Sequence, residues 1–245
     1  MEKIDKQNLP KHIAIIMDGN RRWAKQRGLT TKEGHKAGSK NLEKIALFCN
    51  ELGIKYLTVY AFSTENWKRT KEEVSALMFI LKANLDSMLR KMDLKNIKIR
   101  VIGEEENIPK DIKEKIHKLV EKTKNNTGLI LNIAFNYGGR AEITHVCKKI
   151  AEQIKNNEID IKDINEELIS KYIYTAGQPD PDLMIRTSNE LRTSNFLPWQ
   201  LTYSEFYFPD KHWPEFSEED LLEAIKVYQK RNRRFGGRPD EEKQA

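Results

Sequence analysis

Short apolar runs alternate with longer segments of helical periodicity along this chain, and the alternation limits the folds open to it. The runs typical of strands are 12–17, 56–62, 97–103, 128–135 and 183–187, and the helical segments are 40–52, 71–92, 109–124, 140–155, 164–174 and 217–235. Strands that alternate with helices form a mostly parallel sheet with helices on both faces. The sequence therefore predicts an α/β fold with a largely parallel central sheet.

We expect a single domain over residues 1–245, because no internal repeat or Pro/Gly-rich linker interrupts the alternation. Only residues 239–245 are typical of a flexible tail. The apolar run at 13–17 is far shorter than the ~20 residues of a membrane helix, and the first residues have no signal-peptide core. These features predict a cytoplasmic protein. Cys49 and Cys147 lie in helical segments without metal-ligand spacing, which predicts buried, reduced thiols.

Polar loops follow four of the predicted strands. Their sequences are "DGNRRW" after the first strand, "STENWKR" after the second, "NYGGR" after the fourth and "TSNELRTSN" after the fifth. Ligands of open parallel sheets bind beyond the carboxyl ends of the strands. We therefore expect the loops to meet at one edge and to form an anion site with a metal and an adjacent apolar wall.

Asp18 follows the first predicted strand and precedes Gly19 and two arginines, Arg21 and Arg22. Alone, an Asp-Gly pair is more often a turn whose aspartate caps the next helix. Helix N-termini and arginines both attract phosphate, and a carboxylate beside them would repel a phosphate unless a cation joined the two. Mg²⁺ is typically held by one or two carboxylates and substrate phosphates, so Asp18 is a candidate Mg²⁺ ligand.

Glu205 offers a second carboxylate for such a metal. It stands in "LTYSEFYF" (201–208), among aromatic and apolar residues, where an unpaired carboxylate is costly to bury. From its sequence context alone, a Glu205 side chain that points to solvent is an equally good interpretation.

Further candidates lie in the loops after the second and fifth predicted strands. Asn66 carries a donor and an acceptor and could orient a substrate or help to move a proton. Arg186 and Arg192 each open an Arg-Thr-Ser-Asn unit, which suits a diphosphate, although a surface loop could look similar. A lone histidine such as His35, at the start of a helical segment, is more often structural than an anion contact.

The net charge of +6, from 43 basic and 37 acidic residues, says little about partners, because most cations are spread along the chain. Two clusters stand out, Arg21 with Arg22 and "RNRRFGGR" at 231–238. Nucleic-acid binding through the second cluster is not favoured, since the sequence shows neither a basic groove with stacking aromatics nor a recognised module. We expect no nucleic-acid partner.

Eight segments in order, from "HIAIIMDGNRRWA" through "FSTENWKR" and "IRTSNELRTSNF" to "RRFGGR", resemble the cis-prenyltransferases of the undecaprenyl diphosphate synthase type over residues 12–238. The resemblance implies a homodimeric α/β enzyme that adds isopentenyl diphosphate units, in cis geometry, to an allylic diphosphate such as farnesyl diphosphate. It implies Mg²⁺ as cofactor and the undecaprenyl precursor of a cell-wall carrier lipid as product. Delivery of that product implies a cytoplasmic enzyme peripheral to the inner face of the membrane.

The resemblance also assigns roles position by position. Asp18 is the essential carboxylate and a Mg²⁺ ligand, Glu205 is the second ligand, and Asn66 is the proton acceptor. Residues 233–237 resemble a segment that reaches the partner subunit's site, and 74–89 would line an apolar product tunnel or simply pack in the core. The substrate-binding positions are Gly19, Asn20, Arg21, Arg22, Trp23, His35, Ser63, Thr64, Glu65, Trp67, Arg69, Arg186, Arg192, Thr193 and Ser194.

Four positions depart from the family pattern. Arg21 and Asn189 replace glycines, Thr31 replaces an arginine beside Lys32, and Thr70 replaces a proline. A non-catalytic binding subunit of the same fold is the alternative function. It is not favoured, because such subunits lose the first-loop aspartate or the diphosphate contacts, which this chain keeps. A trans-type enzyme would carry paired D-D-x-x-D motifs, which are absent from the sequence.

Overall fold

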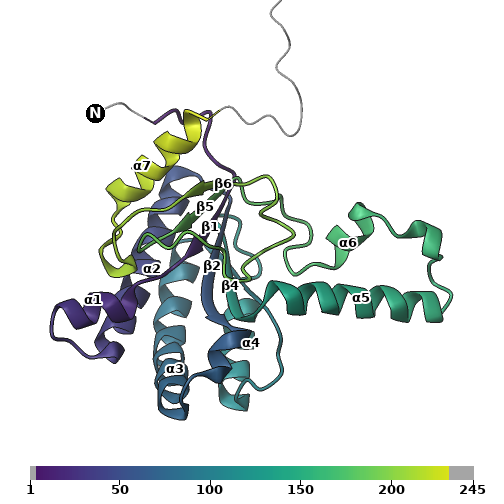
Figure 1. The fold of residues 1–245 in the computed structure, drawn as a ribbon, viewed down its shortest axis with the longest axis horizontal. Helices are drawn as coiled ribbons and strands as arrows, with labels where there is room; N and C mark the ends of the chain where they lie inside the picture. The colour runs from purple at the N-terminus through teal and green to yellow at the C-terminus, as the bar shows by residue number, and fades with distance from the viewer. Residues whose placement is uncertain (1–3, 232–245) are drawn as a thin grey trace, which may run out of the picture.

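The computed structural model describes residues 4–231, apart from the side chains of residues 84, 86, 87 and 89. Its centre is a six-stranded sheet in the order β3-β4-β2-β1-β5-β6, with every neighbouring pair parallel (Figure 1). The predicted α/β fold and parallel sheet are confirmed. The strands are β1 (His12–Ile16), β2 (Tyr56–Ser63), β3 (Lys98–Ile102), β4 (Ile130–Tyr137), β5 (Leu183–Arg186) and the unpredicted short edge strand β6 (Glu205–Tyr207).

Seven α-helices lie within the described residues. The predicted helices are all present, and a further short one follows β1 directly. The helices are α1 (Asn20–Gln26), α2 (Thr31–Leu52), α3 (Lys71–Leu94), α4 (Lys110–Thr123), α5 (Gly139–Lys155), α6 (Glu166–Tyr172) and α7 (Glu218–Gln229).

Helix α2 begins at Thr31, before the helix start predicted near His35 and well before the periodic segment 40–52. Thr30 and Glu33 form a reciprocal capping box, in which each side chain accepts from the other residue's backbone N–H. Gly34 and Gly38 lower the helix propensity of this turn and hide it in the sequence. Both are needed for close packing, because a Cβ would lie 2.3 Å from the Asn20 carbonyl oxygen at Gly34 and 2.1 Å from Asn20 Oδ1 at Gly38. The glycines thus let α1 sit directly against α2.

Helices α2, α3, α4 and α7 cover one face of the sheet and bury the larger apolar core (Figure 1). Segment 196–201 covers much of the other face, with Phe196, Leu197 and Leu201 buried against Ala14 and Met184. Helix α5 extends away from the sheet and packs with α6 in a separate small cluster (Figure 1).

The two cysteines differ in their surroundings. Cys49 is buried in α2, as predicted, but Cys147 on α5 is exposed, so the prediction of a second buried thiol is wrong. Cys147 is exposed where α5 extends away from the sheet (Figure 1). None of the helices in 4–231 combines the length and apolar character that a membrane crossing requires.

A buried hydrogen-bonded chain joins β1, β2 and β4 at the amino-terminal half of the sheet. His12 is fully buried; its Nδ1 lies 2.7 Å from the Pro179 carbonyl and its Nε2 lies 2.7 Å from Thr58 Oγ1. Asn132 Nδ2 in turn donates to Thr58 Oγ1 at 2.9 Å. Because the Pro179 carbonyl can only accept, Nδ1 carries the proton and Nε2 accepts from the Thr58 hydroxyl. The chain is therefore built for a neutral His12.

This arrangement predicts acid-sensitive stability. Burial lowers the pKa of His12 to about 4, against smaller raising effects of the Pro179 hydrogen bond and of Asp182. Between pH 6.5 and 4 the unfolded chain binds a proton at His12 that the folded chain does not, so its contribution is complete above pH 6.5 and is lost as the pH falls. The free energy of unfolding, from urea titrations, should fall by about 1 kcal/mol per pH unit from this group alone. His12→Gln should show a shallower pH dependence over this range, and equal slopes in the two proteins would contradict the assignment.

Candidate functional site

A cavity of about 1280 Å³ opens at the carboxyl edge of the sheet. Its lining comes from the loops after β1, β2 and β5 and from the first turns of α2, so the predicted convergence of these loops is confirmed. The loop after β4 does not line the cavity in the described structure but lies against the other loops. The predicted site residues in the lining are Asp18, Gly19, Asn20, Arg21, Arg22, His35, Ser63, Glu65, Asn66, Arg69, Arg186 and Ser194.

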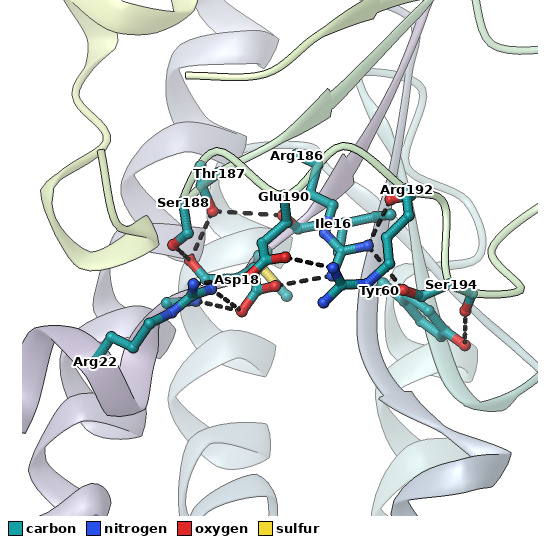
Figure 2. Close-up of polar contacts among 12 residues, drawn as sticks. Ile16, Asp18, Arg22, Tyr60, Arg186, Thr187, Ser188, Glu190, Arg192 and Ser194 are labelled. Carbon is teal, nitrogen blue, oxygen red and sulfur yellow. Dashed lines mark hydrogen bonds and ion pairs between the residues drawn. The ribbon is translucent and has the colours of Figure 1, made fainter. Parts of the chain in front are cut away.

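The Asp18 carboxylate lies between two arginines at this edge (Figure 2). Its Oδ2 accepts from Arg186 Nη2 at 2.9 Å, and its Oδ1 is 3.1 Å from Arg22 Nη2 and accepts from the Gly19 N–H at 2.7 Å. Burial alone would raise the pKa of Asp18, but the hydrogen bond and charge of Arg186, followed by the charge of Arg22, more than offset it and lower the pKa. Asp18 is therefore ionised at neutral pH.

The backbone of Asp18 is fixed as firmly as its side chain. Its carbonyl accepts from Thr187 Oγ1 at 2.7 Å, from Ser188 Oγ at 3.0 Å and from the Trp213 N–H at 2.9 Å. Gly19 follows with φ 101°, and a Cβ there would lie 2.1 Å from Ser188 Oγ. Gly19 caps α1 without a side chain, so the interpretation of Asp18 as an ordinary helix cap is wrong.

Arg186 is the buried member of this group, at 4% exposed. Besides Asp18, its guanidinium donates through Nη1 to Ser194 Oγ at 2.7 Å and to the Arg192 carbonyl. Its Nε has no partner among the described residues. One buried cation thus joins the loop after β1 to the loop after β5.

Glu190 is a member of the charge cluster that the sequence reasoning missed. Its Oε1 accepts from Arg22 Nη1 at 2.6 Å and its Oε2 is ion-paired with Arg192 (Figure 2). Asn189 before it has φ 51°, a conformation that asparagine tolerates better than most residues, which explains how it replaces a glycine. The sequence signal for Glu190 was its place between two repeated arginine units.

The loop after β2 divides between the cavity and the core. Asn66 Oδ1 accepts from the Ser63 N–H at 3.0 Å, which holds Asn66 at the cavity. Trp67 points the other way: its Nε1 donates to Asn136 Oδ1 at 2.6 Å and its ring packs on Phe62. Trp67 therefore anchors the loop rather than lining the cavity.

His35 lines the cavity as a neutral imidazole. Burial, with the nearby charges of Arg69 and Arg21, lowers its pKa to about 4. At neutral pH it can hydrogen-bond an anion but carries no charge toward it. Arg21 forms an ion pair with Glu73 at the start of α3, with 3.2 Å between Arg21 Nη1 and Glu73 Oε1.

The other family departures are also placed. Thr31 lines the cavity where the family has an arginine, while Lys32 lies over the ring of Phe79, 4.7 Å from its centroid. Thr70 caps α3 by accepting from the Glu73 N–H. Predicted site residues outside the described lining are Trp23, Thr64, Trp67, Arg192, Thr193 and Glu205.

Glu205 lies far from Asp18 within one chain. It is the first residue of β6 and pairs in register with Leu183, whereas Arg186 at the other end of β5 reaches Asp18. Leu183 and Arg186 are three residues apart along β5, which corresponds to about 10 Å. The side chain of Glu205 is engaged elsewhere, because its Oε2 accepts from Arg231 Nη1 at 2.6 Å. The expected pairing of Asp18 and Glu205 at one metal is therefore not met within a chain. The sequence placed Glu205 near a strand but could not show which end.

A Mg²⁺ ion with a diphosphate nonetheless fits the cavity edge. No group of three or more His, Cys, Asp or Glu side chains with metal-binding geometry occurs among the described residues, so the protein does not form an all-protein cage there. Mg²⁺ commonly needs only one or two carboxylates when substrate phosphates supply the other oxygens. Asp18, ionised and beside two arginines, matches that donor set.

Helix α3 contributes little to the cavity. Of the predicted tunnel segment 74–89, Leu77 is in the lining, while Met78, Leu85 and Met88 are buried in the main core. The core-packing interpretation of this helix is confirmed for those side chains.

Comparisons with known proteins agree with this geometry. A family model described as undecaprenyl diphosphate synthase matches residues 16–236. An isoprenyl transferase of Clostridium tetani is 51% identical, over 96% of this chain and 92% of that protein. A ditrans,polycis-undecaprenyl-diphosphate synthase of Micrococcus luteus, specific for (2E,6E)-farnesyl diphosphate, is 50% identical, over 96% of this chain and 94% of that protein. The crystal structure of a lavandulyl diphosphate synthase from Lavandula x intermedia with dimethylallyl diphosphate superposes with a TM-score of 0.90 and 38% identity, over 93% of this chain and 98% of that one.

Proposed function

Because this chain belongs to the undecaprenyl diphosphate synthase family of isoprenyl transferases, we propose that it elongates an allylic diphosphate, preferably farnesyl diphosphate, with isopentenyl diphosphate units in cis geometry. The chain is a prenyltransferase rather than a non-catalytic relative. The observation that carries the proposal is Asp18, an ionised carboxylate held by Arg186 and Arg22 at the edge of a cavity of about 1280 Å³. A metal-bridged diphosphate requires such a charge arrangement.

The two diphosphates would use different parts of the cavity edge. The loop Gly19–Arg22 would receive the starter diphosphate, with His35 as a neutral hydrogen-bonding partner. Arg186, Arg192 and Ser194 would receive the diphosphate of isopentenyl diphosphate. In the structure Glu190 pairs with Arg22 and Arg192, one cation from each group. A diphosphate at either position would compete with Glu190 for its arginine.

The residues of this chain then account for the chemistry. The allylic C–O bond breaks, the starter carbon bonds to the isopentenyl double bond, and the adduct loses a proton. The arginines stabilise negative charge on the departing diphosphate, and Mg²⁺ bound at Asp18 would add positive charge there. The side-chain oxygen Oδ1 of Asn66 already accepts from the Ser63 N–H through one lone pair, and its second lone pair is the acceptor that a proton-transfer role requires.

We also propose a homodimer peripheral to the membrane, as in the family resemblance. The segment that would cross to the partner, 233–237, lies outside the described residues, as does the predicted tail 239–245. Arg231, just before that segment, is described and pairs with Glu205 of its own chain. A cross-subunit role of the segment, and of Glu205 as a second ligand, stays a prediction.

Product sizing tests the proposal. Purified protein is incubated with farnesyl diphosphate, labelled isopentenyl diphosphate and Mg²⁺, and the dephosphorylated products are separated by chain length. A series of labelled polyprenols with new cis double bonds is expected. A single product with one added unit, or a branched condensation product, would contradict repeated cis elongation.

Arg192→Ala should weaken the use of isopentenyl diphosphate and leave starter binding largely unchanged. Its guanidinium is well exposed and paired only with Glu190 in the described structure, and its backbone carbonyl, which Arg186 needs, is kept in the variant. Charge-assisted hydrogen bonds contribute about 1.5–3 kcal/mol, so KM for isopentenyl diphosphate should rise roughly tenfold to a hundredfold. Steady-state kinetics with each substrate varied in turn measures this. An unchanged KM for isopentenyl diphosphate with a raised KM for the starter would reverse the assignment.

A further inference from the structure

Asn195 connects the loop after β5 to two other loops, those after β2 and β4. Its carbonyl accepts from the Gly139 N–H at 2.8 Å and its Oδ1 accepts from the Arg140 N–H at 2.9 Å, both in the first turn of α5. Its Nδ2 donates to Glu65 Oε1 at 2.7 Å, in the loop after β2. Asn195 itself belongs to the loop after β5 and lines the cavity.

The backbone around Asn195 adopts unfavourable conformations to make these contacts. The φ angles are 51° at Ser194, 64° at Asn195 and 48° at Leu197. These values lie in the left-handed region, which residues other than glycine rarely adopt. Such conformations persist only where surrounding contacts hold them. The fully buried Leu197 supplies one such contact.

The loop after β4 is shaped to admit Asn195. A Cβ on Gly138 would lie 2.5 Å from Thr64 Oγ1 and 3.0 Å from Asn195 Nδ2. A Cβ on Gly139 would lie 2.0 Å from the Pro198 ring. The "NYGGR" loop does not itself line the cavity, but it packs against both the loop after β2 and the loop after β5.

The contacts of Asn195 connect the two groups of residues that the reaction needs. On one side its neighbour Ser194 accepts from Arg186, which holds Asp18. On the other side Glu65 is followed directly by Asn66. We propose that Asn195 is a positioning residue that sets the separation of the diphosphate-holding loop and the Asn66 loop, and so aligns the isopentenyl unit with the starter carbon. This inference rests on the proposed function and adds to it a residue that touches no reacting atom.

A purely structural role as the cap of α5 is the competing explanation, and Asn195→Asp separates the two. The new carboxylate keeps the acceptor for the Arg140 N–H and adds negative charge at the start of a 17-residue helix, which is favourable. It removes the donor to Glu65 and places two carboxylates together. The thermal stability of Asn195→Asp should therefore equal that of the wild type, while the hydrogen bond between Asn195 and Glu65 is lost.

The matched partner change is Glu65→Gln. In Glu65→Gln alone, the side-chain oxygen can still accept from Asn195 Nδ2. In the double variant, the side-chain amide introduced at position 65 can donate to the carboxylate introduced by Asn195→Asp. The hydrogen bond between the two loops is then restored with the donor on the other side. We expect Asn195→Asp alone to lower kcat roughly thirtyfold, with KM for both substrates within about threefold. In the Glu65→Gln background the same change should lower kcat less than about threefold, a coupling that the double-mutant cycle isolates from any cost of Glu65→Gln itself.

The readouts distinguish the possible failures. Wild-type elongation is measured first, so its absence counts against the proposed function alone. Amide hydrogen exchange, which needs no turnover, should be faster in residues 63–68 of Asn195→Asp and unchanged in the first turn of α5. An equal kcat loss in both Glu65 backgrounds, or a loss of thermal stability that parallels it, would overturn the positioning role.

Discussion

Replacing Asp18 with asparagine is expected to lower kcat by at least about a thousandfold while the fold survives. Asparagine keeps the shape of the side chain but has one acceptor oxygen, so it can retain either the Gly19 N–H contact made by Oδ1 or the Arg186 contact made by Oδ2, and it loses the negative charge. That charge would hold the metal where the leaving diphosphate forms, and about 4 kcal/mol of transition-state stabilisation corresponds to a thousandfold in rate. Single-turnover and steady-state rates at saturating Mg²⁺ measure the effect.

The matched control for Asp18→Asn is Glu190→Gln, which removes a carboxylate from the same charge cluster without touching Asp18. Glu190 is paired with Arg22 and Arg192, the cations that would receive diphosphates, so its loss should change KM more than kcat. If Asp18→Asn keeps more than about a tenth of wild-type kcat, the barrier has changed by less than about 1.4 kcal/mol. Asp18 would then not be the essential carboxylate.

Arg186→Gln should have the next largest effect, on both stability and activity. Arg186 is 4% exposed and makes contacts with Asp18, Ser194 and the Arg192 carbonyl. Removing Arg186 leaves the partly buried Asp18 carboxylate with Arg22 as its remaining cationic partner among the described residues, and it takes the buried donor away from Ser194 and the Arg192 carbonyl. We expect a loss of about 2 kcal/mol of unfolding free energy. Loss of one charged donor to a developing anion should lower kcat/KM for isopentenyl diphosphate by at least about a hundredfold.

Arg22→Gln is the informative comparison for stability, because Arg22 bonds the same carboxylate from a more exposed position, with 44% of its side chain accessible. Exposed ion pairs contribute about 1 kcal/mol or less, so urea denaturation should show a clearly smaller loss for Arg22→Gln than for Arg186→Gln. Equal losses would mean that burial does not distinguish the two arginines. The pairing of Asp18 with Arg186 would then not be what holds the two loops together.

The parallel sheet and the edge that binds ligand could be predicted from the sequence because both depend on local periodicity. Apolar runs of strand length bounded by polar loops indicate β1, β2 and β4, and parallel order brings their carboxyl ends to one edge. Strand β6 is too short to show a period. The first turns of α2 were hidden by glycines that close packing requires.

The site was predictable where a residue stands next to a strand end and not where partners are distant in sequence. Asp18 and Arg186 each lie at such an end. The contact of the Trp213 N–H with the Asp18 carbonyl and the contact of Asn195 with α5 join residues far apart along the chain, and no local pattern specifies them. Trp67 was assigned to substrate by the family resemblance, whereas in the structure its indole N–H donates to Asn136 Oδ1.

The role of Asp18 and of the two arginine groups is tested most directly by a crystal structure of the wild-type protein with Mg²⁺, isopentenyl diphosphate and a thio analogue of farnesyl diphosphate that cannot ionise. Both diphosphates are expected at the carboxyl edge of the sheet, the starter beside Gly19–Arg22 and the isopentenyl diphosphate on Arg186 and Arg192, with Mg²⁺ on Asp18. Glu190 should have released at least one of its two arginines. Diphosphates bound elsewhere, or a metal held without Asp18, would overturn the proposed roles of these residues.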